Sequence, residues 1–366
     1  MSRTNHRRNG PVVTLDDVAR AAGVSRATVS RVVNRSVKVS PQAQRAVERA
    51  IHELGYVPNL AARSLVTRRS DSIGLVIPEP TGLLSTDPYF ALLLRGISAE
   101  CSAAGLQLVL LMPQSPADEQ RAEAFLAAGH LDGALLVSLH GNDPLPKRLR
   151  ERGVPVVVGG RPPAGANVSY VDVDNEHGAR IAVEHLLAGG RRVIAIIGGP
   201  LDMPAGIDRL AGFRHARANA GLPLDHSLEV HGPFTREAGV AGMRTLLERR
   251  PDIDAVFAAS DLLAAGALQV LAAAGRRVPD DVALVGFDDS PLAETLQPPL
   301  TSVRQPIEEM GREMTRILIG EMAATTVVPR RVILSTELVV RASSTPRPEV
   351  AESPGAGRLE GPGNAP

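Results

Sequence analysis

The sequence predicts a protein with a small all-α domain at its N-terminus and a larger α/β region built from parallel sheets. Short aliphatic runs alternate with longer amphipathic ones between Ser72 and Arg341, a pattern typical of buried parallel strands covered by helices. This region of about 270 residues exceeds the usual size of a single hydrophobic core, so we expect two lobes. Before it, helical periodicity without strand-like runs indicates a separate helical domain.

The first predicted helix begins after Thr14, whose hydroxyl can cap it while the carboxylate of Asp17 caps in return. Glycine accepts the left-handed backbone of a helix end, so Gly23 is expected to stop this helix. Between these signals an apolar stripe recurs at helical spacing, formed by Leu15, Val18, Ala19 and Ala22.

A second helix is predicted from Arg26 to Val33, with Ser25 as its cap. Its valines, Val29, Val32 and Val33, can pack inward, which leaves outside Arg26, Ala27, Ser30 and Arg31. A third helix begins at Pro41, a favoured first helical position, and offers to a shared core Ala43, Ala46, Val47, Ala50 and Leu54. Two helices joined by a tight turn form a helix-turn-helix, which can enter a DNA groove.

Charge separates a DNA-binding domain from an ordinary helical bundle, the alternative interpretation. Residues 1–70 carry 13 Lys and Arg against 4 Asp and Glu, whereas the rest of the chain carries 27 against 36. The positive charge therefore lies in the first fifth of a chain with no net charge, as expected for contact with phosphates.

A short hinge helix is predicted between Tyr56 and Leu65. Pro58 breaks the preceding helix and Asn59 can cap a new one of barely two turns, too short to be stable alone in water. Basic residues follow up to Ser70. Such a segment suits folding on DNA with an apolar side chain wedged between base steps; an ordinary interdomain linker is the alternative.

The larger region supplies a regular series of strands and helices. The strands are expected to begin at Ile73, Leu106, Gly133, Val154, Val193, Ala255 and Val282. The longer amphipathic segments predict helices over Phe90–Ala104, Asn175–Leu187, Leu210–Ala220, Ala238–Arg249 and Leu262–Ala274.

The chain resembles the LacI/GalR family of bacterial transcription regulators from about Val13 to Arg341. The resemblance rests on TLDDVARAAGVSRATVSRVVN, on GYVPNLAARSL and on the strand runs above. It implies a homodimer whose helix-turn-helix headpieces bind a pseudo-palindromic double-stranded operator. It also implies a periplasmic-binding-protein-like core, with two Rossmann-like lobes joined by three crossing strands, which we expect near Asp172–Asp174, Leu300–Ser302 and Pro329–Val332.

These inferences predict the domain boundaries. We expect a disordered basic N-terminus over residues 1–11, a headpiece over 12–57, a hinge helix and linker over 58–70, and a disordered tail over 343–366. The effector-binding and dimerisation core covers 71–342, with lobe 1 at about 71–173 plus 302–329 and lobe 2 at about 174–300 plus 331–342.

The resemblance also implies which residues contact DNA. Arg26 and Ala27 would set operator choice, and Leu65 would enter the minor groove. Alanine offers only a methyl contact, for instance to thymine, so hydrogen-bonded base readout falls mainly to Arg26 and Arg31. The full set implied is Thr14, Ser25, Arg26, Ala27, Thr28, Ser30, Arg31, Asn34, Asn59, Ala62 and Leu65.

An effector pocket is expected where the carboxyl ends of strands from both lobes meet, the general rule for open α/β sheets. Polar and aromatic residues follow several strand runs, and the resemblance assigns to effector binding Asp87, Tyr89, Phe90, Arg209, Phe234, Asp261 and Asp288. Carboxylates and an Arg bind hydroxyls, and aromatic faces cover a sugar ring. Asp261 can equally cap a helix and Phe90 can be core, while Asp174 and Asp289 can be purely structural.

A carbohydrate is the predicted effector, and a purine or nucleoside is the alternative. In the purine-binding pattern of the family an arginine occupies the loop after Gly-Gly-Pro, where this chain has Met203. We predict no cofactor, no metal site among the scattered histidines, and no catalytic residue, since nucleophile-elbow, P-loop, dinucleotide and zinc-protease motifs are absent from the sequence.

A solute-binding protein for transport is the rival class, but it calls for a signal peptide and no headpiece, and the sequence predicts the reverse. The single cysteine, Cys101, excludes an intrachain disulfide and fits a reducing compartment. No apolar run approaches the ~20 residues that span a membrane, so we expect a cytoplasmic protein without membrane contact.

Overall fold

The computed structural model describes residues 13–33, 39–57 and 69–345. It divides into two compact units, one up to Ser70 and one from Asp71 onward. The predicted hinge helix lies outside the described residues, together with the predicted DNA contacts Asn34, Asn59, Ala62 and Leu65. The basic N-terminus and the tail after Thr345 lie outside them as well.

The first unit contains the three predicted helices, α1 (Leu15–Ala22), α2 (Arg26–Val33) and α3 (Pro41–Leu54). The reciprocal cap of α1 is confirmed, because the Asp17 amide donates to Thr14 Oγ1 at 3.3 Å while the Thr14 amide donates to Asp17 Oδ2 at 2.9 Å. Gly23 ends α1 at φ 65°, a left-handed backbone that favours glycine.

A small apolar core holds these helices together. Val18, Val29 and Val47 are completely buried where the three helices meet. The prediction that Leu54 belongs to this core is wrong, because its side chain is 37% exposed. Leu54 is the last residue of α3, and the turn that follows brings Tyr56 back onto the core, which Ile51 also contacts.

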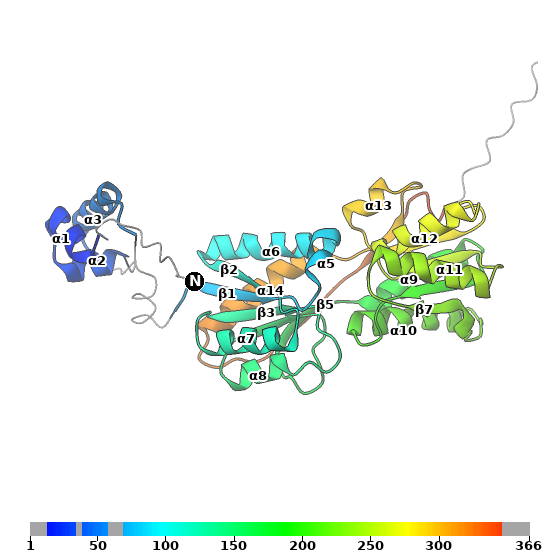
Figure 1. Cartoon of the computed structure of the whole chain (residues 1–366), viewed down its shortest axis with the longest axis horizontal. Helices are drawn as coiled ribbons and strands as arrows, with labels where there is room; N and C mark the ends of the chain where they lie inside the picture. The colour runs from blue at the N-terminus through cyan, green and yellow to red at the C-terminus, as the bar shows by residue number, and fades with distance from the viewer. Residues whose placement is uncertain (1–12, 34–38, 58–68, 346–366) are drawn as a thin grey trace, which may run out of the picture. The chain divides into compact units, whose positions relative to one another are not determined.

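Lobe 1 of the second unit is a six-stranded parallel sheet in the order β11-β5-β4-β3-β1-β2. One face is covered by α6 and α14, and the other by α7 and α8 (Figure 1). The strands are β1 (Ser72–Val76), β2 (Gln107–Leu111), β3 (Gly133–Val137), β4 (Val156–Gly159), β5 (Ser169–Val173) and β11 (Arg331–Leu334). The helices are α5 (Thr81–Thr86), α6 (Pro88–Ala104), α7 (Pro116–Ala127), α8 (Leu145–Glu151) and α14 (Ile307–Ala323).

Lobe 2 repeats this architecture in the order β12-β10-β9-β8-β6-β7, and only the edge strand β12 runs antiparallel to its neighbour. Helices α9 and α10 cover one face, and α11 and α12 cover the other. The strands are β6 (Ile194–Gly198), β7 (Glu229–His231), β8 (Ala255–Ala258), β9 (Ala283–Asp288), β10 (Thr301–Arg304) and β12 (Glu337–Val339). The helices are α9 (Asn175–Ala188), α10 (Pro204–Asn219), α11 (Arg236–Arg249), α12 (Asp261–Ala273) and α13 (Pro291–Thr295).

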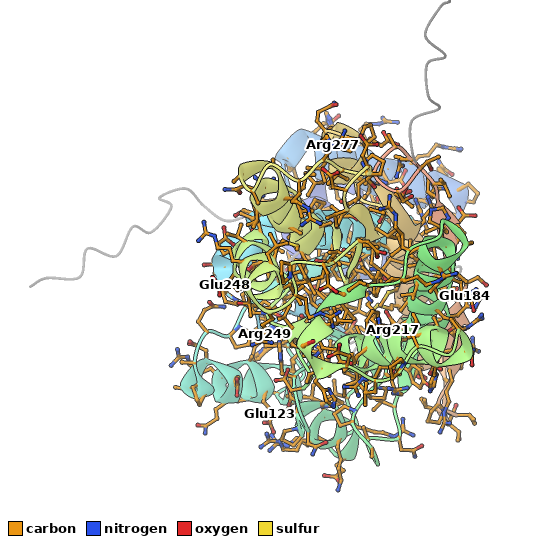
Figure 2. All side chains as sticks on the ribbon, turned by 90° about the vertical axis from the view of Figure 1, so that its right-hand side faces the viewer. Glu123, Glu184, Arg217, Glu248, Arg249 and Arg277 are labelled. Carbon is orange, nitrogen blue, oxygen red and sulfur yellow. The ribbon has the colours of Figure 1, made fainter. Side chains whose placement is uncertain are left out.

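Both lobes therefore have the predicted α/β class, with parallel sheets between helical layers. Charged side chains lie on the outer surface of lobe 2. Glu184, Glu248 and Arg277 are exposed there (Figure 2). Among the described residues, no helix has the length and apolar character that crossing a membrane requires.

Two of the three predicted crossings between the lobes are misplaced. The first follows β5 at Asp174, as expected. The second follows β10, because residues 301–304 pair with β9 in lobe 2, where Ser302 lies opposite Gly286. The third follows β11, which pairs with β5 in lobe 1 and sets Val332 opposite Val171. Lobe 2 therefore includes 301–304, and lobe 1 includes 331–334. The prediction failed here because the sequence of a strand alone does not reveal which sheet the strand joins.

The ordered core also extends past the predicted boundary at residue 342. Ser343 and Ser344 are buried in lobe 2. The Leu284 amide donates to the Ser343 carbonyl at 2.8 Å, and Ser343 Oγ donates to the Leu284 carbonyl at 2.6 Å. Ser343 belongs to the fold because its hydroxyl satisfies backbone groups of β9 and β10, and Ser344 because its hydroxyl bonds the side chains of Thr301 and His185.

Candidate functional site

A pocket lies between the two lobes, at the carboxyl ends of their strands. It holds about 1000 Å³ of empty space, part of it open to solvent. Loops after β1, β3 and β4 line one side, and loops after β6, β7 and β9 line the other. Of the residues predicted for effector binding, those that line it are Asp87, Tyr89, Phe90, Arg209, Phe234 and Asp288.

Arg209, in α10, is the buried cation of the pocket. Its Nε donates to Asn175 Oδ1 at 2.8 Å, and its Nη1 donates to the Ala259 carbonyl at 2.6 Å. The guanidinium lies 3.7 Å from the centre of the Phe287 ring and 5.4 Å from that of Phe234. Burial lowers the pKa of Arg209, and the nearby Asp288 opposes this shift. These contacts hold the side chain in one position and leave a donor edge near the cavity.

Asp288 faces Arg209 from the end of β9. Its Oδ1 lies 3.8 Å from Arg209 Nη1 and accepts a hydrogen bond of 2.5 Å from Gln305 Nε2. Burial raises the pKa of Asp288 well above its usual value, and the attraction of Arg209 offsets this only in part. The residue adopts φ 109°, an unusual backbone for a non-glycine residue. Such local strain occurs where a side chain is held for a function.

Asp87 and Tyr89 form the lobe 1 side of the pocket at the start of α6. Asp87 caps this helix by accepting the Tyr89 amide at 2.9 Å. Burial raises the pKa of Asp87 to about 6, opposed by the hydrogen bond from the Tyr89 amide. The Tyr89 ring meets Phe90 edge-on at 5.4 Å, and Phe90 is also part of the lobe 1 core.

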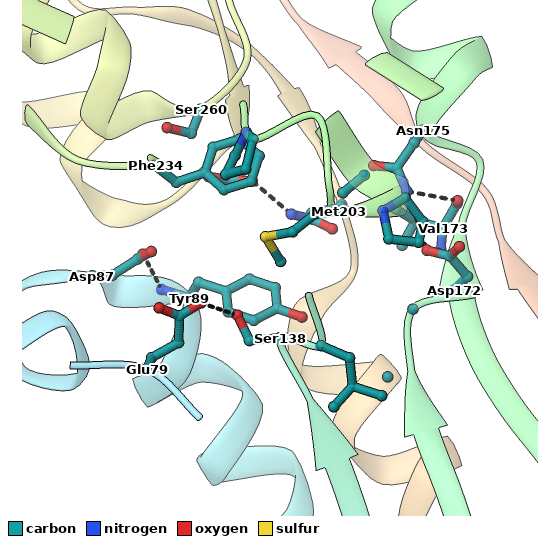
Figure 3. Close-up of a pocket in the computed structure, with 18 of the residues that line it drawn as sticks. Glu79, Asp87, Tyr89, Ser138, Asp172, Val173, Asn175, Met203, Phe234 and Ser260 are labelled. Carbon is teal, nitrogen blue, oxygen red and sulfur yellow. Dashed lines mark hydrogen bonds between the residues drawn. The ribbon is translucent and has the colours of Figure 1, made fainter. Parts of the chain in front are cut away.

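Met203, from the loop between β6 and α10, points into the space between the rings of Phe234 and Tyr89 (Figure 3). Aromatic faces from opposite lobes therefore border the cavity together with a flexible thioether. Such faces suit the apolar C–H surface of a ring-shaped ligand, while the carboxylates serve its hydroxyl groups.

Asp261, which the resemblance assigns to effector binding, does not line the pocket. Its carboxylate lies buried inside lobe 2 and accepts from the Ser290 amide at 2.7 Å, from Ser290 Oγ at 2.9 Å and from Ser302 Oγ at 2.6 Å. Asp261 thus ties α12 to β10 and α13. Asp289 is also structural, since it pairs with Arg304 at 2.7 Å and Arg341 at 2.6 Å.

Sequence reasoning missed several pocket residues. Asn175 is the first residue of α9 and comes two positions after the end of β5, so the rule that found Asp288 points to it as well. Asp172 lies within β5 and accepts from Asn175 Nδ2 at 3.1 Å. Ser138 and Gln305 come directly after β3 and β10, so the same rule points to them as well. Glu79, His140 and Arg161 lie further along the loops after β1, β3 and β4, where the sequence pattern does not reveal the course of the chain.

The headpiece presents a second candidate surface. Arg26, Ala27 and Arg31 are exposed along α2, as predicted, and Ser30 is half-buried. Arg26 lies 3.8 Å from the exposed Asp16 carboxylate, a solvated pair that a phosphate or a base can displace. Ser25 and Thr28 hydrogen-bond through their hydroxyls at 2.9 Å at the start of α2.

Comparison with known proteins identifies the family. A model described as bacterial regulatory proteins, lacI family, matches residues 14–59, and one described as a periplasmic binding protein-like domain matches residues 183–344. The HTH-type transcriptional regulator CelR of Thermobifida fusca is 52% identical over 332 residues, which cover 90% of this chain and 98% of that relative. The chain belongs to the LacI family. It is a DNA-binding transcription regulator, and the predicted resemblance is confirmed.

Solved structures agree with this assignment. A complex of the transcriptional regulator CelR with cellobiose is 50% identical, with a TM-score of 0.73 over 90% of this chain and 99% of that one. A lac repressor dimer bound to operator and an anti-inducer is 27% identical, with a TM-score of 0.80 over 91% of this chain and 99% of that one. The LacI-family regulator described here therefore has both the headpiece and the two-lobed core of its relatives.

Proposed function

We propose that this regulator is a cytoplasmic transcription repressor that binds a pseudo-palindromic operator as a homodimer and changes its operator affinity when a sugar binds between its lobes. We further propose that the sugar is a β-linked glucose disaccharide, cellobiose. The observation that carries the proposal is the pocket itself, with carboxylates and one buried arginine around facing aromatic rings.

Hydrogen-bonding capacity in the pocket favours a polyol. Acceptors come from the carboxylates of Asp87, Asp172 and Asp288, and donors come from Arg209 and the Gln305 amide. Each sugar hydroxyl both donates and accepts, so a ring with several hydroxyls can satisfy such a mixed set. The rings of Tyr89 and Phe234 border the cavity on either side of Met203, and aromatic faces of this kind suit the C–H faces of a sugar (Figure 3).

The charge of the pocket disfavours an anionic ligand. Arg209 is already engaged by Asn175, by the Ala259 carbonyl and by Asp288. Arg161, the other arginine in the lining, donates to Asp208 at 2.7 Å. A phosphate or carboxylate ligand would face several carboxylates while the charge of Arg209 is already opposed by Asp288, whereas an uncharged sugar meets no such repulsion. The likeness to the CelR–cellobiose complex supports the same class of ligand.

A ligand screen tests the effector. Thermal unfolding is measured with cellobiose, lactose, ribose and adenosine, and any hit is then titrated by calorimetry. A ligand that binds only the folded protein raises the unfolding temperature, and we expect this from cellobiose and not from adenosine. Stabilisation by adenosine alone would favour the purine class and overturn the sugar proposal.

Binding-site selection tests the operator. The full-length protein should select a two-fold symmetric duplex, with affinity falling steeply as salt rises because lysines and arginines displace phosphate counterions. In Arg26→Ala the preferred base should change at one position of each half-site. Arg45→Ala, an exposed change on α3, is the matched control and should keep the wild-type sequence. An unchanged preference in Arg26→Ala would show that α2 does not read bases through this residue.

A further inference from the structure

A chain of three charged side chains joins the two lobes at the pocket. His140, in the loop after β3, lies with Nε2 3.1 Å from Glu79 Oε1 and with Nδ1 3.0 Å from Asp202 Oδ2. Glu79 and His140 belong to lobe 1, whereas Asp202 lies in the loop between β6 and α10 of lobe 2. The imidazole thus bridges a carboxylate from each lobe.

The exposure of these side chains places the bridge at the rim of the pocket. Asp202 is 56% exposed, His140 is 38% exposed and Glu79 is 13% exposed. Glu79 in turn accepts from the Ser138 hydroxyl, which faces the cavity (Figure 3). This series of hydrogen-bonded side chains therefore extends from the solvent to the lining of the pocket and crosses from one lobe to the other.

Two further hydrogen bonds join the lobes beside this bridge, and together with the bridge they form what we call the seam. The Gly141 amide donates to the Asp202 carbonyl at 2.7 Å, and Arg161 donates to Asp208 Oδ1 at 2.7 Å. Asp208 directly precedes Arg209 in α10. The first turns of this helix therefore carry both the lobe 2 side of the seam and the cation of the pocket.

We propose that Glu79, His140 and Asp202 form a gate that closes one solvent-facing end of the pocket and limits the length of the sugar that the pocket accepts. This proposal rests on the proposed sugar-binding function. A disaccharide fits behind the closed gate, whereas a longer β-linked glucose oligosaccharide has to break the bridge between the lobes in order to extend into solvent.

The chemistry of the gate favours the closed form at neutral pH. The hydrogen bonds that His140 donates to Glu79 and to Asp202 raise the pKa of His140 to about 9, against the effect of its partial burial. The imidazolium then lies between two carboxylates, so each interaction is charge-assisted. Opening the gate leaves Glu79 beside Ser138 without its cation, which is a cost that a longer ligand has to overcome.

Calorimetric titration with cellobiose and cellotriose tests the length limit. Wild type should bind cellobiose more tightly than cellotriose. In His140→Ala the Kd for cellotriose divided by the Kd for cellobiose should fall about tenfold, because this variant binds cellotriose more tightly. Asp202→Ala removes the lobe 2 partner and should act in the same direction. His215→Ala is the matched control, because His215 pairs with exposed Glu176 at 2.8 Å and does not line the pocket. An unchanged ratio in both gate variants overturns the length limit.

A measurement without ligand separates the gate from the choice of sugar. Hydrogen exchange at the Gly141 amide reports on the seam, because this amide donates across it to Asp202. Exchange should be about tenfold faster in His140→Ala than in wild type, while an amide inside β6, such as that of Ile196, should be unchanged. If wild type binds neither sugar, the proposed effector is wrong and this exchange result alone decides the gate. Equal exchange at Gly141 in both proteins overturns the gate itself.

Discussion

At the scale of single residues, the two carboxylates predicted for the effector have different surroundings. Asp288 faces the pocket beside Arg209, with one hydrogen bond from Gln305. Asp261 is enclosed in lobe 2 and accepts three hydrogen bonds from Ser290 and Ser302. The Asp288 carboxylate is thus available to a ligand, whereas the Asp261 carboxylate is engaged in hydrogen bonds within lobe 2.

This contrast predicts opposite effects of mutation. Asp288→Asn should weaken effector binding by about 1–3 kcal/mol, since one acceptor oxygen facing the pocket is replaced by an amide donor, with an unfolding temperature close to that of wild type. Asp261→Ala leaves buried donors without an acceptor and should lower stability by about 2–4 kcal/mol. Calorimetric titration and thermal unfolding of both variants check this. Weaker effector binding by Asp261→Ala at unchanged stability would contradict the structural role.

The raised pKa of Asp87 leads us to expect that effector binding depends on pH. Burial raises its pKa from 3.8 to about 6, and the groups that face it are Arg209 and Glu79. Sugar hydroxyls donate to the ionised carboxylate, so affinity should rise as the pH increases through about 6. The effect on stability has the opposite sign, because a raised pKa favours folding while the carboxyl is protonated, and this contribution is lost as the pH rises from 3.8 to 6.

Titration of the effector between pH 5 and 8 measures this dependence. In Asp87→Asn the side chain does not ionise, so the rise near pH 6 should disappear, apart from any contribution of Asp288. A wild-type affinity that stays flat across pH 6 would show that Asp87 accepts no hydrogen bond from the ligand.

At the scale of elements, three helix pairs pack through glycine. A Cβ at Gly96 of α6 would overlap the Glu308 carbonyl of α14, and the same holds for Gly212 of α10 against α9 and for Gly239 of α11 against α12. These glycines are needed because backbone, and not a flexible side chain, lies opposite them. Helix contact at this distance also sets how close each pair can lie to its sheet.

Gly96→Ala should therefore destabilise lobe 1 by about 1–3 kcal/mol or more through overpacking. The matched control is Gly320→Ala in α14, where the added methyl group meets open space. This control should be neutral or gain up to about 1 kcal/mol from helix propensity. Denaturant unfolding of both variants is the measurement. Equal stability of the two variants would mean that α6 and α14 are further apart than described.

At the scale of the whole molecule, charge and domain organisation coincide. The first 70 residues carry a net charge of +9, and the remaining residues carry −9. The basic part includes the helix-turn-helix, and the acidic part includes a pocket with several carboxylates. DNA and a neutral sugar therefore meet different parts of the chain.

Effector and operator binding should be thermodynamically coupled. The pocket is lined by both lobes, so a ligand favours one arrangement of them, and dimeric operator binding can depend on that arrangement. Coupling of about 1–3 kcal/mol is typical, and it must be equal in both directions. Operator affinity is measured with and without saturating effector, and effector affinity with and without operator. In Asp288→Asn the effect of the same effector concentration should be lost. Independent binding of the two ligands would contradict the coupling.

The sequence by itself determined the local features of this protein. The caps of α1 and α2 and the turn at Gly23 depend on residues within a few positions of one another. Buried strands are recognisable because both faces need apolar side chains. Residues that follow such strands collect at one edge of a parallel sheet, so the pocket positions of Asp87, Arg209, Phe234 and Asp288 could be predicted.

Only the tertiary structure decided which segments meet. The sequences of the strands at 301–304 and 331–334 are compatible with either sheet, and the lobe of each strand is set by pairing with β9 and with β5. Asp261 and Asp288 both lie at the carboxyl end of a strand. Only Asp261 has its carboxylate taken up by hydrogen bonds from Ser290 and Ser302, which come from distant segments of the chain. In the sequence His140 is one of several scattered histidines, and only the fold places it 3.0 Å from Asp202 of the other lobe. These outcomes depend on contacts between residues far apart in the chain, which local periodicity and residue type do not encode.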